Sequence, residues 1–148
     1  MEVVLAEEKA ILEKVFSLRR KVFVKEQGVP PELEWDEEDS TAIHAAVLHH
    51  EEVIGTGRLV VKGNSGRIGR MAVSKEWRGK GVGSLILRKL VEMGIEKRLN
   101  RVYLHSQLHA KPFYLKHGFK PIGEIFEEAG IPHQEMVLFL TLESQRQD

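Results

Sequence analysis

The fold of this chain follows from residues 71–84, which read Met71-Ala72-Val73-Ser74-Lys75-Glu76-Trp77-Arg78-Gly79-Lys80-Gly81-Val82-Gly83-Ser84. An apolar segment at 67–74 leads into a glycine-rich turn, and apolar residues then recur at helical spacing from Gly81 to Arg98. The spacing of apolar residues distinguishes extended from helical segments. The sequence therefore predicts a strand at 67–74, a tight turn and a long helix at 81–98.

A helix that begins directly after glycines offers a site for an anion. Its first amides lack helical partners, the helix dipole adds positive charge there, and glycine lets a bulky anion approach the main chain. We expect a phosphate or diphosphate as ligand. The turn is neither G-x-x-x-x-G-K-[ST], because Gly81 follows Lys80, nor G-x-G-x-x-G, because Ser84 is sixth. A glycine-rich helix start without a ligand and a nucleotide-phosphate binder stay open as alternatives.

The flanking segments indicate a sheet with helices packed on it. Helices are expected at 8–24 and 109–117, strands at 42–49, 52–62, 102–104, 119–123 and 136–142, and an acidic loop or broken helix at 26–39. A helix, a strand meander and then alternating strands and helices indicate the α/β (α+β) class. No repeat or linker interrupts the chain, so one domain over 1–148 is expected.

Composition excludes several classes of protein and site. The 148 residues include no cysteine, which excludes disulfides, thiolate metal sites and a cysteinyl acyl-enzyme. Lys plus Arg and Asp plus Glu are 22 each, so no nucleic-acid partner is expected. The seven histidines have no metal-binding spacing, and no metal is expected. The first residues do not read as a signal peptide and the longest apolar run is Met136 to Leu140, so we expect a cytoplasmic protein without a membrane partner.

Two motifs carry a resemblance to a known family. Arg78 to Gly83 matches the pattern Q/R-x-x-G-x-G/A. The block Gln107-Leu108-His109-Ala110-Lys111-Pro112-Phe113-Tyr114-Leu115-Lys116-His117-Gly118-Phe119 resembles N-x-x-A-x-x-x-Y-x-x-x-G-F, with Gln107 in place of Asn. Because the two motifs occur in this order and at this spacing, the chain resembles the GNAT superfamily of N-acetyltransferases over nearly its whole length. The run Arg20 to Gln27, with Asp36, Asp39 and His44, resembles the ElaA/YjcF-like bacterial branch.

The resemblance implies a single GNAT-type domain, with a mixed, mostly antiparallel sheet that is splayed at its centre and has helices on both faces. It implies acetyl-CoA as the cofactor and allows a homodimer. The diphosphate of the cofactor would be bound by main-chain amides of Arg78, Gly79, Lys80, Gly81, Val82, Gly83 and Ser84. Beside the pantetheine and thioester, Met71, Ala72 and Val73 would line the splayed strand edge. Gln107, which is one methylene longer than the usual Asn, and Tyr114 would complete the site.

The implied reaction is direct transfer of the acetyl group from the thioester to a primary amine of a small molecule or peptide, through a ternary complex. It needs a base, because a lysine-type amine is protonated near neutral pH. It also needs an acid for the departing thiolate, and Tyr114 is the candidate, with a role as a core aromatic as the alternative. A strand amide near Ala72 or Val73 could stabilise the oxyanion. For the base, His105, Glu26, Glu34 and His44 stay open.

Loops around 26–39 and 124–134 are expected to decide acceptor specificity by their shape. The acidic residues from Glu26 to Asp39 either attract cationic amines or form a solvated charged loop. Trp35 is expected to anchor that loop to the core. The alternative function is a non-catalytic acyl-CoA-binding sensor or interaction module with the same fold.

Overall fold

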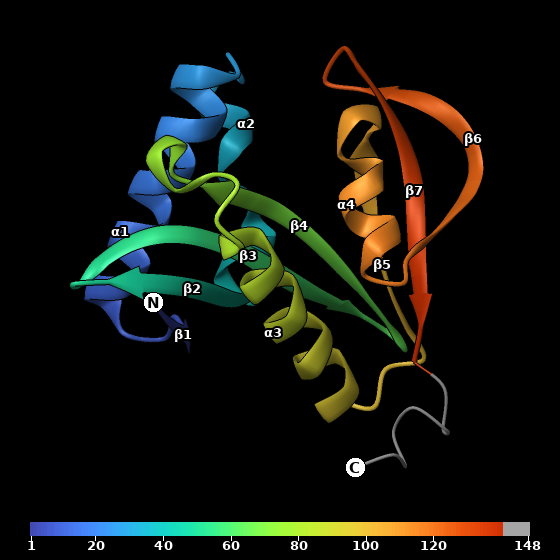
Figure 1. Ribbon diagram of the computed structural model, residues 1–148, viewed down its shortest axis with the longest axis horizontal. Coiled ribbons are helices and arrows are strands. Elements are labelled where there is room, and N and C mark those ends of the chain that lie inside the picture. Colours follow the sequence, from blue (N-terminus) through green and yellow to red (C-terminus); the bar gives the residue numbers. More distant parts are fainter. Residues whose placement is uncertain (141–148) are drawn as a thin grey trace.

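The computed structural model describes residues 1–140, in which seven strands form one sheet with helices packed on it (Figure 1). The elements follow in the order β1 (Glu2–Leu5), α1 (Lys9–Arg19), η1 (Arg20–Glu26), α2 (Pro31–Glu34), η2 (Glu37–Ser40), β2 (Ile43–His49), β3 (Glu52–Lys62), β4 (Ser65–Val73), η3 (Lys75–Trp77), α3 (Val82–Glu96), β5 (Arg101–Gln107), η4 (Leu108–Ala110), α4 (Lys111–Lys116), β6 (Lys120–Glu128) and β7 (Ile131–Phe139). Among the described residues, no helix combines the length and apolar character that crossing a membrane requires.

The sheet opens in its middle, between β4 and β5. The strand order is β1-β2-β3-β4-β5-β7-β6, and neighbours are antiparallel except β4 and β5, which run parallel because α3 carries the chain across. Their pairing covers only residues 65–67 against residues 101–103. Beyond these pairs the two strands separate, as Figure 1 shows. The predicted mixed, mostly antiparallel and splayed sheet is confirmed.

Alternate residues of β2 show which helix covers which face. Ala45 and Val47 belong to the buried cluster that contains Ile86 of α3. Ala46, between them, packs instead with Val15 of α1. Because successive strand residues point to opposite faces, α1 and α3 cover opposite faces of the sheet. Helices on both faces, as predicted, are therefore confirmed.

The N-terminal region differs from the prediction in two elements. Strand β1 was not predicted, because four residues are too few for a periodic pattern and their extended state depends on pairing with β2. The helix expected at 8–24 is α-helical only to Arg19 and continues as the π-helix η1. In η1, Val22 packs with Leu18 and Ala72, so this segment stays on the sheet. Hydrophobic spacing alone does not separate π turns from α turns.

The last two strands are longer than the predicted segments 119–123 and 136–142. Strands β6 and β7 form a hairpin, so residues 124–134 are not a loop. Ala129 and Gly130, with φ of 53° and 75°, form its turn. Strand β6 is the edge strand and is largely exposed on both faces, so its sequence lacks the alternation that marks a half-buried strand. Residues 141 and 142 of the predicted strand lie outside the described residues.

Candidate active site

We call residues 78–84, between β4 and α3, the glycine loop. Gly79 and Gly81 have φ of 75° and 84°, a left-handed conformation that favours glycine. A Cβ atom added at either glycine would meet no other atom within 4 Å. The main chain of the loop therefore faces open space, where a side chain on either residue would project.

The start of α3 supplies further unpaired donors. The first helical hydrogen bond runs from Leu85 N to Gly81 O at 3.2 Å, and no side chain caps the helix. The amides of Val82, Gly83 and Ser84 consequently have no helical acceptor. Together with the open space at the glycines, these donors fit a diphosphate.

Close packing fixes the position of this helix start. A Cβ on Gly55 of β3 would lie 2.5 Å from Val82 Cγ1, so α3 approaches β3 more closely than a larger residue allows. A Cβ on Gly83 would lie 3.4 Å from Phe113 Cζ, so α4 packs directly against the first turn of α3. These two contacts place the glycine loop beside the opening between β4 and β5.

The Arg78 side chain holds the loop in place. Its Nε donates to Val73 O at 3.0 Å, and its Nη2 lies 2.6 Å from Glu26 Oε1. Lys80 Nζ lies 5.3 Å from the centre of the Trp77 ring, within cation–π range. The two cationic side chains are thus engaged by protein groups, and the main chain carries the open donors of the loop. The Glu26 partner was not foreseen from the sequence.

The free edge of β4 faces the opening. Ser74 N donates to Ile54 O of β3 at 2.8 Å, so the preceding N–H, that of Val73, points to the other edge. The side chains of Met71 and Val73 pack in the cluster on the α3 face, whereas Ala72 packs on the α1 face. All three predicted residues line the edge through their main chain, while their side chains belong to the core.

Gln107 and Tyr114 lie on the other side of the opening. Gln107 is the last residue of β5 and is paired with His133 of β7. Tyr114, on the short helix α4, packs edge-on against Phe113 and Phe119, with ring centres 5.0 and 6.1 Å apart. Burial raises the pKa of Tyr114 to about 12. Its phenol therefore stays protonated at neutral pH.

Two of the four base candidates are engaged inside the protein. Glu34 is 3% exposed, and its Oε1 accepts from Arg19 Nε at 2.5 Å. His44 is 5% exposed, and its Nε2 lies 2.9 Å from Asp39 O. Burial lowers the pKa of His44, although Asp39 acts in the opposite direction. Neither side chain faces the opening between β4 and β5 with a free basic group.

His105 lies close to the point where β4 and β5 separate, two residues beyond the last paired residue of β5. Its neighbour Leu104 packs on the α3 face, so the His105 ring lies on the opposite face. His105 Nδ1 lies 3.0 Å from Glu128 Oε1, and Nε2 lies 3.3 Å from Glu135 Oε1. The fourth candidate, Glu26, is paired with Arg78 as described above.

Part of the acidic segment is not solvated, because three arginines take up its carboxylates, whereas Glu32 and Glu37 are exposed. We call Arg19, Arg58 and Arg70, with Glu34, Asp36 and Asp39, the arginine cluster. Asp39, 4% exposed, lies 2.7 Å from Arg19 Nη1 and 2.8 Å from Arg58 Nη1. Burial raises the pKa of Asp39, but hydrogen bonds from Arg19 and Arg58 outweigh it and bring that pKa down to about 2.

A bulge in β4 connects the cluster to the opening. The register with β3 shifts between Thr56 and Arg58, and Arg70, with φ of 50°, lies in the bulge. Arg70 Nε donates to Glu34 O at 3.0 Å. The expectation that Trp35 anchors this segment is wrong, since Trp35 is 49% exposed. The arginines, whose partners the sequence does not reveal, hold the segment instead.

Comparisons with known proteins agree with this geometry. The family model for the acetyltransferase (GNAT) domain matches residues 5–140. The uncharacterized N-acetyltransferase YjcF of Bacillus subtilis is 38% identical, over 93% of this chain and 99% of its own. Protein ElaA of Escherichia coli is 34% identical, over 80% of this chain and 81% of its own. The crystal structure of Escherichia coli ElaA matches with a TM-score of 0.82 at 29% identity, over 92% of this chain and 97% of that chain.

The fold and the match over residues 5–140 lead to one family. Acetyltransferases with this fold use acetyl-CoA, and the unpaired amides of the glycine loop fit its diphosphate. The chain therefore belongs to the GNAT acetyltransferase family, in its ElaA/YjcF-like branch, and is an acyltransferase that uses acetyl-CoA.

Proposed function

We propose that the protein transfers an acetyl group directly from acetyl-CoA to a primary amine of a small molecule or peptide, within a ternary complex. The observation that carries this proposal is the set of unpaired main-chain donors at the glycine loop and on the β4 edge, with Tyr114 across the opening. Acetyl-CoA, when bound, supplies an acetyl thioester that an amine can attack without an enzyme-bound intermediate. The chain contains no cysteine that could form one.

The proposed acid and the proposed base lie on opposite faces of β5. Tyr114 packs with the cluster on the α3 face, which contains Leu104, whereas His105 points to the opposite face. We assign Tyr114 to the coenzyme sulfur and His105 to the acceptor amine. His105 is favoured over Glu34 and His44 because it lies next to the point where β4 and β5 separate and its side chain is 18% exposed, whereas those two are buried.

The proton balance then follows from these two residues. An alkylammonium acceptor gives up two protons, and the sulfur gains one. His105 accepts the two amine protons one after the other, the first from the ammonium and the second as the new C–N bond forms, and passes each to solvent, aided by the carboxylates of Glu128 and Glu135. Tyr114 donates a hydrogen bond and then its proton to the sulfur, and recovers a proton from solvent. The Val73 N–H, which points away from β3, would donate to the carbonyl oxygen as negative charge develops there.

Replacing Tyr114 by Phe tests the proposal. We expect kcat to fall by about 100-fold or more, as is typical for loss of a general acid. The Kd for acetyl-CoA, measured by calorimetry, should change by less than about two-fold, because the phenol contributes little to binding in the ground state. Because the pKa of Tyr114 is about 12, wild-type kcat should show no loss from Tyr114 ionisation up to about pH 10. Unchanged turnover in Tyr114→Phe would contradict the acid role.

Replacing His105 by Gln tests the base. The loss in kcat/KM should be largest near neutral pH and smallest near pH 10, where more of a lysine-type amine is already neutral. A loss that is equal at all pH values would indicate that His105 only shapes the site. A panel of polyamines, amino sugars, amino acids and peptides, followed by release of free thiol, would identify the acceptor class. If no amine is acetylated while acetyl-CoA binds, the non-catalytic sensor is the better account.

A further inference from the structure

The proposed base, His105, is surrounded by charged side chains of both signs. Arg67 of β4 lies on the same face of the sheet, because its neighbour Ile68 packs on the α3 face. Arg67 Nη2 lies 3.1 Å from His105 Nδ1 and 3.5 Å from Glu128 Oε1. Glu135 Oε1 lies 3.3 Å from His105 Nε2. We call Arg67, His105, Glu128 and Glu135 the base cluster.

The base cluster can be reached by a small molecule. The exposed fractions of its four side chains range from 18% for His105 to 42% for Glu128, with Arg67 at 32%. Arg67 and Tyr103 form the last pair between β4 and β5, so the cluster lies where the two strands separate. A molecule that enters the opening from this face therefore meets a cation, two carboxylates and the base together.

The guanidinium of Arg67 is only partly used by the protein. Among residues 1–140, its hydrogen-bond partners are His105 and Glu128, and both contact Nη2. The remaining N–H groups suit a ligand carboxylate, which accepts two parallel hydrogen bonds from one guanidinium. Arg101, further back on β5, is held by Ser65 Oγ at 3.1 Å and by the Tyr103 ring. Of these two arginines, Arg67 is the one beside the base.

The contacts of His105 Nδ1 show what a ligand carboxylate would change. An arginine only donates hydrogen bonds and an ionised glutamate only accepts them. Nδ1 therefore either accepts from Arg67, at 3.1 Å, or carries a proton and donates to Glu128, at 3.0 Å. A carboxylate that pairs with Arg67 would remove the competing donor. Nδ1 could then take a proton from the acceptor amine and donate it to Glu128.

We propose that the acceptor is a free apolar α-amino acid, whose carboxylate pairs with Arg67 and whose ammonium group lies beside His105 and Glu135. The inference rests on the proposed function, since it assumes that His105 serves the acceptor amine. An α-amino acid carries its amine and carboxylate on one carbon, which matches a guanidinium and a base whose nitrogens are 3.1 Å apart. A polyamine would bring further positive charge to Arg67. The N-terminus of a peptide has a neutral amide in place of the carboxylate.

The rings beside the base indicate the side chain of the acceptor. The centre of the His105 ring lies 5.0 Å from that of Phe126 and 6.4 Å from that of Tyr103. Aromatic surroundings favour an apolar side chain over a charged one. In the reaction, the α-nitrogen bonds to the acetyl carbon as the C–S bond breaks, with the protons transferred as described above. The products are an N-acetyl amino acid and coenzyme A.

Initial rates with two matched pairs of amines test this inference. Phenylalanine and 2-phenylethylamine differ only in the carboxylate, as do leucine and 3-methylbutylamine. In the wild-type protein, kcat/KM calculated for the neutral amine should be about ten- to hundred-fold higher for the amino acid, the range for hydrogen bonds between charged groups. In Arg67→Gln, this ratio should fall to within about two-fold of one. The ratio isolates carboxylate binding, because the contact of Arg67 with His105 affects both members of a pair.

Two further variants serve as controls. Arg67→Lys keeps the positive charge without the planar guanidinium and should retain part of the preference. Arg98→Gln removes an exposed arginine between α3 and β5 and should leave the ratio unchanged. Arg67 is partly exposed, so Arg67→Gln should fold with a melting temperature close to that of the wild-type protein.

Three results would overturn the inference while acetyl transfer itself stands. These are equal rates within each pair in the wild-type protein, an unchanged ratio in Arg67→Gln, and acetylation of polyamines or peptides in preference to both amino acids. If no amine of any class is acetylated while acetyl-CoA binds, the proposed function fails, and the inference fails with it.

Discussion

The glycine loop and the arginine cluster use polar groups in opposite ways. In the loop, main-chain amides are left without acceptors and face open space at Gly79 and Gly81. In the cluster, buried Asp39 and Glu34 are saturated by Arg19 and its neighbours. Donors without a protein acceptor are available to bind a ligand, whereas charges that are paired within the protein stabilise the fold. A run of carboxylates in a sequence is thus weaker evidence for a binding site than a few glycines that expose the main chain.

The largest effect expected from this contrast is on stability, at Asp39. Asp39→Asn leaves Arg19 and Arg58 with less compensating charge in a buried site, which should cost about 3–5 kcal/mol of unfolding free energy. Urea denaturation monitored by circular dichroism measures this loss. Glu92→Gln is the matched control, because Glu92 is 66% exposed, pairs with Lys89 at 3.6 Å outside the cluster, and should contribute less than about 1 kcal/mol. Equal losses in the two variants would refute a structural role for the cluster.

Lowering the pH should show the contribution of the Asp39 carboxylate to stability in the unmodified protein. Asp39 has a pKa of about 2 in the folded protein against 3.8 as its ordinary value, so its folded form favours the ionised carboxylate. This contribution is present above about pH 4 and is lost as pH falls through 2, and amounts to about 2 kcal/mol. Denaturation measured between pH 5 and 2 should show a loss that is smaller by this amount in Asp39→Asn. An identical pH dependence in both proteins would argue against the low pKa.

The smallest of the three effects is expected at Gly81, and it should separate binding from stability. Gly81→Ala forces alanine into a left-handed conformation, which costs about 1–2 kcal/mol, and places a methyl group in the space in front of the loop. We expect the affinity for coenzyme A to fall about ten-fold. Gly63→Ala in the β3–β4 turn carries a similar strain, with φ of 61° and no atom within 4 Å, far from the loop in sequence. It should lower the melting temperature similarly and leave coenzyme binding intact.

Many elements of the fold are encoded by short stretches of sequence and were therefore predictable. The strand at 52–62 coincides with β3, and the helix expected at 81–98 contains α3, because glycine turns and apolar periodicity are read within a short window. The edge of the sheet was not predictable in this way. Strand β1 and the outer half of β6 owe their extended state to pairing partners and carry no alternation of their own. The π-turn of η1 likewise has no signature in residue spacing.

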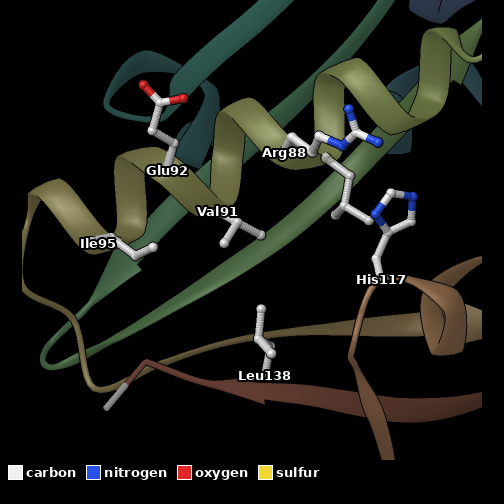
Figure 2. Close-up of a pocket in the computed structure, with 7 residues that line it drawn as sticks. Arg88, Val91, Glu92, Ile95, His117 and Leu138 are labelled. Carbon is white, nitrogen blue, oxygen red and sulfur yellow. The ribbon is translucent and has the colours of Figure 1, made fainter. Parts of the chain in front are cut away.

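The candidate site also has parts that short motifs predict and parts that depend on residues far apart in the chain. The glycine loop and Tyr114 were predicted from short motifs, which are recognised within a few neighbouring residues of the chain. The partners of Arg58 and Arg70 lie 19 to 37 residues away and meet only when the sheet forms, so the acidic segment was open to two interpretations. A groove of about 320 Å³ beside Arg88 (Figure 2) was missed for a similar reason, because it forms only where α3, the end of α4 and β7 come together.

The short pairing of β4 and β5 has a consequence for adjacent amides. Ser74 N–H is bonded to Ile54 O, while Val73 N–H, one residue earlier, faces the opening. Hydrogen–deuterium exchange should therefore be slow at Ser74 and fast at Val73 in the free enzyme. A coenzyme that lies along the β4 edge would act as a substitute strand, and the two rates would converge when it is added.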